Sequence, residues 1–213
     1  MVNTIEIREL LANKEVSNLG EVAQWAVADR EILQEILAGV VDKDDTYRHH
    51  CFQVLLQVSD TAPSALYPDW DYFVELLSSP NAFHRSIAVQ IIAGLSRADA
   101  DKRFDAVFER YFALLDDEKV MVARHLVQNA WKIVEAKPYL QVQITARLLE
   151  IDKTHHPKGR KDLIKGDLVE LFGHDFEASQ QQEQIRAFAE QQLASESPKT
   201  RKAAADFVKR YGR

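Results

Sequence analysis

Several residue types that mark particular protein classes are scarce in this 213-residue chain. It contains one cysteine, Cys51, so no intramolecular disulfide can form, and we expect a reducing compartment, the cytoplasm. Seven glycines and six prolines are few for a fold with many tight turns, which argues against an all-β protein. The composition therefore favours helices.

Long apolar runs are also missing. No run approaches the length of a membrane span, and residues 1–11 alternate apolar with charged residues, whereas a secretion signal has a basic region followed by an apolar block. The hydrophobic content of 46% is nevertheless ample for a continuous core. We therefore expect a soluble cytoplasmic protein without a membrane segment.

Sequence motifs for catalysis, cofactors and metals are absent. The chain has no Gly-x-Ser-x-Gly, no His-Glu-x-x-His, no P-loop and no dinucleotide-binding glycine pattern. His49, His50 and Cys51 are consecutive, so on a helix they point about 100° apart and cannot share one ion. His155 and His156 lack a second ligand pair. We expect no metal site, no cofactor and no enzymatic activity.

The chain does contain a repeated helical pattern. Residues 79–95 and 117–134 are two copies of one phrase, in which a short polar turn and an arginine open an apolar run after a Leu-Leu pair. Paired helices that repeat about every 40 residues are typical of an α-solenoid, since one hairpin cannot bury both of its apolar faces. The arginines that open the second helices recur at spacings of 37, 39, 36 and 41 residues: Arg48, Arg85, Arg124, Arg160 and Arg201.

These residues resemble the HEAT/armadillo repeat pattern. A proline or aspartate stands in the turn, followed by apolar residues and the arginine of the second helix, as in residues 66–71, 137–140 and 200–203. Similar phrases occur in uncharacterised bacterial and archaeal HEAT-like proteins. The resemblance implies an all-α fold, a right-handed α-α superhelix of about six helical hairpins. We predict one domain over residues 1–213, with a degenerate capping pair in residues 1–29 and five repeats in residues 30–213.

The charge is distributed unevenly along the chain and between the predicted helices. The formal net charge is −6, yet residues 1–75 carry 5 lysines and arginines against 14 aspartates and glutamates, while residues 137–213 carry 14 against 11. The predicted second helices carry 15 basic and 8 acidic residues, and the first helices are acidic. Because each row of helices forms one face of a solenoid, we expect one acidic and one basic face.

The resemblance implies that the second helices line the concave side, which makes a basic groove a candidate site for an anionic partner. The leading hypothesis is a non-enzymatic scaffold that binds an acidic protein segment. The alternative is duplex DNA binding, because a HEAT-like family of alkylpurine DNA glycosylases uses a basic concave face with tryptophans and a carboxylate, and Trp131 with Glu135 would lie on that row. The predicted binding residues are Arg48, His49, Arg85, Arg124, Trp131, Lys132, Arg160, Lys161 and Arg201.

Two duller interpretations remain open for the same residues. The arginines would bridge only to acidic groups of neighbouring repeats, and Trp131 would be a packing contact. A third possibility for the whole array is an interface between copies of the chain. The sequence does not decide among these alternatives.

Overall fold

The computed structural model describes residues 3–212, and these residues form α-helices and short 3-10 helices with no strand among them. This confirms the all-α prediction. The chain divides into two compact units, residues 1–103 and residues 104–213. The predicted right-handed superhelix over residues 1–213 stays a prediction.

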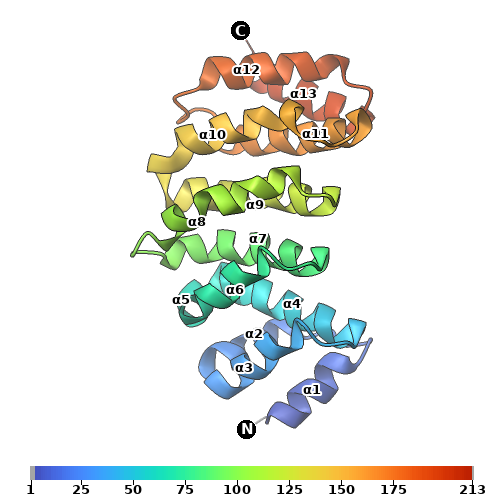
Figure 1. The fold of residues 1–213 in the computed structure, drawn as a ribbon, viewed down its shortest axis with the longest axis vertical. Helices are drawn as coiled ribbons and strands as arrows, with labels where there is room; N and C mark the ends of the chain where they lie inside the picture. The colour runs from blue at the N-terminus through green and yellow to red at the C-terminus, as the bar shows by residue number, and fades with distance from the viewer. Residues whose placement is uncertain (1–2, 213) are drawn as a thin grey trace. The chain divides into compact units, whose positions relative to one another are not determined.

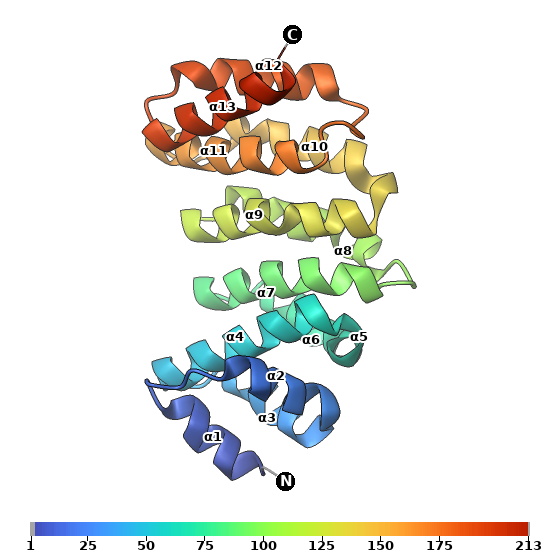
Figure 2. The ribbon, with the colours of Figure 1, turned by 180° about the vertical axis from the view of Figure 1, so that it is seen from behind.

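The first unit is built around its long helix α4 (Figures 1 and 2). Helix α4 packs against five other helices, α1, α2, α3, α5 and α7. The helices of this unit are α1 Thr4–Ala12, α2 Leu19–Ala28, α3 Arg30–Gly39, α4 Asp45–Thr61, α5 Pro63–Leu66, α6 Trp70–Leu76 and α7 Ala82–Leu95, with the 3-10 helices η1 Tyr67–Asp69 and η2 Ser96–Ala98.

Helix starts in this unit follow the cap residues of the sequence. The side chain of Asp44 accepts hydrogen bonds from the backbone N–H groups of Thr46 and Tyr47, which satisfies two donors in the first turn of α4. Asn81 caps α7 in the same way through the N–H of Phe83. Short polar side chains that are typical helix caps in the sequence thus mark the starts of α4 and α7.

The core of the first unit explains the single cysteine. Cys51 is fully buried and free, and burial raises the pKa of its thiol to about 12, so the thiol stays protonated and unreactive. A Cβ atom on Gly39 would lie 2.3 Å from the Cys51 sulfur, so only glycine lets α3 approach α4 this closely. Cys51 is therefore a packing residue of the core.

Helices α9, α11 and α13 of the second unit correspond to predicted second helices of the repeats, as α4 and α7 do in the first unit, and we call these the second-row helices. In the second unit α11 packs against both α9 and α13 (Figure 2). Its α-helices are α8 Arg103–Phe112, whose first residue belongs to the first unit, α9 Val120–Ala136, α10 Gln141–Leu149, α11 Lys158–His174, α12 Gln182–Gln191 and α13 Pro198–Tyr211. Its 3-10 helices are η3 Ala113–Asp116, η4 Pro138–Leu140, η5 Glu150–Lys153 and η6 Gln192–Ala194.

Two predicted loops are partly helical. The prolines at positions 63 and 68 predict a loop from the sequence, but the segment forms α5 and η1, because proline fits the first turn of a helix, where its missing N–H has no partner to lose. The charged and histidine-rich residues 153–159 also predict a loop, which ends early because α11 begins at Lys158. None of the helices within residues 3–212 has the length and apolar character needed to cross a bilayer.

Candidate functional site

Three arginines of the predicted series share one contact, a hydrogen bond to the backbone carbonyl six residues earlier. These carbonyls belong to the turn before each second helix, where the backbone has no helical partner. The shared contact ties the turn to the helix that follows it. The three Nη1 atoms donate over 2.7 Å from Arg48 to Asp42, 2.8 Å from Arg85 to Ser79 and 2.7 Å from Arg201 to Ser195.

The two arginines of the first unit are held by their surroundings. Arg85 is only 8% exposed and also donates to the carbonyl of Pro80 over 3.2 Å. Arg48 forms an ion pair with Asp45, and its guanidinium lies 5.3 Å from the ring centroid of Phe83. Arg85 and Arg48 are therefore structural arginines, and neither offers an exposed guanidinium to a partner.

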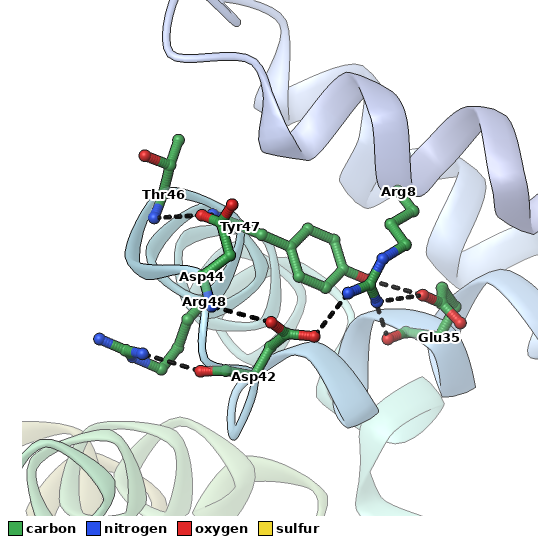
Figure 3. Close-up of polar contacts among 7 residues, drawn as sticks. All are labelled: Arg8, Glu35, Asp42, Asp44, Thr46, Tyr47 and Arg48. Carbon is green, nitrogen blue, oxygen red and sulfur yellow. Dashed lines mark hydrogen bonds and ion pairs between the residues drawn. The ribbon is translucent and has the colours of Figure 1, made fainter.

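The surroundings of Arg48 also anchor the first helix of the chain (Figure 3). Arg8 of α1 reaches Glu35 at 3.4 Å and Asp42 at 2.6 Å, and it lies 4.5 Å from the ring centroid of Tyr47. The backbone N–H of Asp44 and the ion pair with Arg8 together lower the pKa of the Asp42 carboxyl. His49, another predicted site residue, is exposed beside His50 and takes no part in this cluster.

Arg124 forms an ion pair in the second unit. Its Nε and Nη2 donate to the two carboxylate oxygens of Asp167 over 2.6 and 3.1 Å, and Lys199 donates to the same group over 3.1 Å. The Asp167 side chain is fully buried. Burial alone would raise its pKa, but the hydrogen bonds from Arg124 and Lys199 outweigh burial, and the pKa lies below the ordinary value. Asp167 thus joins helices α9, α11 and α13.

Sequence reasoning missed Asp167 as the anion of this cluster. It lies within the apolar run of α11, between Ile164 and Phe172, and a carboxylate there needs a partner if it is to be buried. That position on the apolar face was the available signal.

Arg160 and Lys161 differ from the other members of the series. The Arg160 side chain is exposed and forms no hydrogen bond or ion pair with the part of the chain that the structure describes. Lys161 instead donates to a turn carbonyl, that of Asp152, over 2.8 Å. In this repeat the residue that bonds a turn carbonyl is therefore Lys161, one position after Arg160.

Cations gather where α11 and α13 begin, all of them exposed except the half-buried Lys161, and we call this group the basic edge. The two helix starts lie side by side, because Lys158 pairs with Glu196 at 2.6 Å and the Thr200 hydroxyl donates to the Asp162 carbonyl over 2.6 Å. Helix α13 alone carries five lysines and arginines against one aspartate. The basic edge comprises Lys158, Arg160, Lys161, Lys199, Arg201 and Lys202.

Trp131 and Lys132 do not belong to the basic edge. Trp131 lies in the last turns of α9 and stacks on the ring of His174, with centroids 5.2 Å apart and planes 5° from parallel. His174 ends α11 and Lys158 begins it, so the two sites lie at opposite ends of a helix roughly 24 Å long. Lys132 is buried, with 8% of its surface exposed.

A cavity of about 450 Å³ opens beside Trp131 in the second unit. Apolar side chains from α10 and α11 line its interior, including Ile144, Leu148 and Phe172. Glu135, one turn after Trp131, also borders it. The sequence pointed to the Trp131 and Glu135 pair but not to the cavity, since the other walls come from residues distant in sequence.

Nothing in the described ranges assembles a metal site. No group of three or more histidines, cysteines, aspartates or glutamates within residues 3–212 could hold an ion. His155 lies 2.5 Å from the Asp116 carboxylate, and His156 bonds the Leu115 carbonyl at 3.0 Å, so both histidines tie the start of α11 to η3. No protein-family model matches this sequence, and no curated protein matches it either.

Proposed function

We propose that the chain is a non-enzymatic, cytoplasmic interaction protein that binds an acidic segment of another protein at the basic edge. The observation that carries the proposal is the concentration of exposed lysines and arginines at the adjoining starts of α11 and α13. Positive potential at such a surface attracts anionic side chains and speeds their encounter.

The basic edge keeps a surplus of charge despite its internal contacts. The Arg201 guanidinium bonds only backbone carbonyls among the described residues, so no carboxylate there neutralises its charge. The Arg160 side chain bonds none of the described residues. Lys202 pairs with Asp206, but its side chain is 80% exposed. Exposed pairs of this kind contribute at most about 1 kcal/mol and are readily exchanged for a partner's carboxylate.

A short acidic protein segment fits this surface better than duplex DNA. The carboxylates of Glu170, Glu196 and Asp206 border the basic edge, and the whole chain is negative, so a long polyanion meets repulsion beyond the immediate contact. A segment a few residues long can avoid those carboxylates. We therefore favour the hypothesis of protein binding over that of nucleic-acid binding.

Fluorescence anisotropy tests the proposal with a labelled glutamate-rich peptide, its glutamine-substituted counterpart and a labelled DNA duplex. The wild-type protein should bind the acidic peptide, and its affinity should fall about tenfold between 50 and 200 mM salt. It should not bind the glutamine peptide. The double variant Arg160→Glu/Lys202→Glu should weaken binding at least about tenfold, because it reverses two exposed charges.

Lys209→Glu is the matched control, since it reverses a charge at the other end of α13 and should leave the affinity unchanged. Equal affinity for the acidic and glutamine peptides would contradict the proposal. So would absence of peptide binding at low salt. Tight binding of the DNA duplex without peptide binding would instead support the hypothesis of duplex DNA binding.

A further inference from the structure

One residue that lines the cavity beside Trp131 has a buried acceptor atom without a partner among the described residues. Gln141, which lines the cavity, is only 7% exposed, and its Nε2 donates to Thr145 over 3.0 Å and to Ser179 over 2.8 Å. Its Oε1 is buried and accepts no hydrogen bond from the described residues. A buried carbonyl oxygen left in this state costs about 1–3 kcal/mol, which a ligand's N–H or O–H would recover.

The electrostatic environment of the cavity favours a cation. Glu135 and Asp175 border it, and none of the described residues that line it is a lysine or arginine. Helices α9 and α11 end beside the cavity, at Ala136 and His174, while α10 begins beside it at Gln141, so the two carboxylates and not the helix dipoles decide the sign of the charge that the cavity favours.

The interior of the cavity requires an apolar body on the same ligand. Leu148 and Ile144 are almost completely buried, and Leu171 and Phe172 close the side formed by α11. Pockets of roughly 300–1,000 Å³ with apolar walls and a few placed polar groups are typical of small-molecule sites. A volume of about 450 Å³ falls within this range.

We infer that this cavity binds a small free amine, an apolar body that carries a protonated amino group. The apolar body fills the space between α10 and α11, and the ammonium donates toward Gln141 Oε1 and lies within the field of Glu135 and Asp175. This site lies at the opposite end of α11 from the basic edge, so the inference does not depend on the proposed binding of an acidic segment.

Three probes with one body and different end groups test this inference: 4-phenylbutylammonium, 4-phenylbutanol and 4-phenylbutyrate. Isothermal titration at pH 7 should show the tightest binding for the ammonium, about tenfold weaker binding for the alcohol, and none for the carboxylate. Quenching of tryptophan fluorescence should accompany binding, since Trp131 borders the cavity.

Two variants test separately how much the carboxylates at the cavity and the buried acceptor of Gln141 contribute to the affinity. The surface variant Glu135→Gln/Asp175→Asn should reduce the affinity of the ammonium to that of the alcohol and leave the alcohol unchanged, while Glu190→Gln, an exposed charge outside the cavity, should alter neither. Gln141→Leu should weaken both probes about tenfold. Circular dichroism checks that each variant is folded.

Two results would overturn the inference. One is binding of the carboxylate as tightly as the ammonium, and the other is failure of all three probes to bind at millimolar concentration. If Gln141→Leu does not fold, the surface double variant still decides the question, because its two side chains are exposed and make no part of the core.

Discussion

A guanidinium in the first turn of a helix faces the positive end of the helix dipole, so it needs compensation nearby. Arg85 and Arg201 obtain it from turn carbonyls and Arg124 from a buried carboxylate. Residues that recur at one register of the repeat thus have different partners. The consequence is that equal substitutions along the series should have unequal effects.

Arg85→Ala should lower the free energy of unfolding by about 1.5–3 kcal/mol, because two turn carbonyls lose a charged donor in a nearly closed environment. Arg160→Ala should change it by less than about 0.5 kcal/mol, since that side chain is exposed and makes no polar contact with the described residues. Urea unfolding followed by circular dichroism measures both. Equal effects of the two substitutions would refute the distinction.

Asp167→Asn should reveal a pH-dependent contribution. The pKa of Asp167 is lower in the folded chain than in the unfolded one, so its contribution is complete above about pH 5 and is lost as the pH falls through the folded pKa. The variant should be about 1.5–3 kcal/mol less stable at pH 7, with a smaller difference at pH 3.

Urea unfolding at the two pH values measures the effect of Asp167→Asn. Glu190→Gln serves as the control, because its exposed side chain should leave stability unchanged at both. A difference between Asp167→Asn and wild type that grows on acidification would have the wrong sign for a carboxylate of lowered pKa.

The sequence could locate the arginines of the repeat but not their partners. The period depends on side-chain type, which a sequence displays, whereas the carbonyl acceptors of Arg85 and Arg201 are backbone atoms that every residue has. Trp131 could be singled out from the sequence, but its stacking partner His174 could not, because His174 is 43 positions further along and belongs to another helix.

At the scale of elements, close packing between second-row helices depends on glycine. A Cβ atom on Gly166 of α11 would lie 2.7 Å from the Thr200 hydroxyl and 3.3 Å from its Cα, and one on Gly94 of α7 would lie 3.0 Å from the Ser59 carbonyl oxygen of α4. In each unit, a second-row helix therefore approaches its neighbour at a glycine.

Gly166→Ala should destabilise the protein by about 1–3 kcal/mol, because the added methyl group pushes α13 away from α11. Gly159→Ala in the same helix should instead stabilise it by about 0.4–1 kcal/mol, since nothing lies within 4 Å of its Cβ position and alanine favours the helix. Thermal unfolding of the two variants compares them directly. A stabilising Gly166→Ala would show that the two helices do not pack this closely.

Helices were predicted well and their ends less well. The apolar period of the sequence predicts second helices over residues 118–135 and 197–211, where the structure has α9 Val120–Ala136 and α13 Pro198–Tyr211. The exceptions are short, such as α5 after Pro63, where local backbone geometry decides and no apolar period is long enough to be read.

At the scale of the molecule, charge is the property that the sequence carries most clearly. The repeat predicted one basic row, but the surroundings of its cations differ, since Arg85 and Lys132 are buried while Arg160 and Lys202 are exposed. A formal charge count treats these residues alike. Burial depends on tertiary packing, so the exposed part of the row, the basic edge, emerged only from the structure.

Titration of isotopically labelled protein with the glutamate-rich peptide, followed by amide chemical shifts, tests the central claim most directly. We expect the largest changes in amide chemical shift in the first turns of α11 and α13, near Arg160 and Lys202. These changes should disappear in the Arg160→Glu/Lys202→Glu variant. Shifts concentrated around Trp131, or in the first unit, would contradict it.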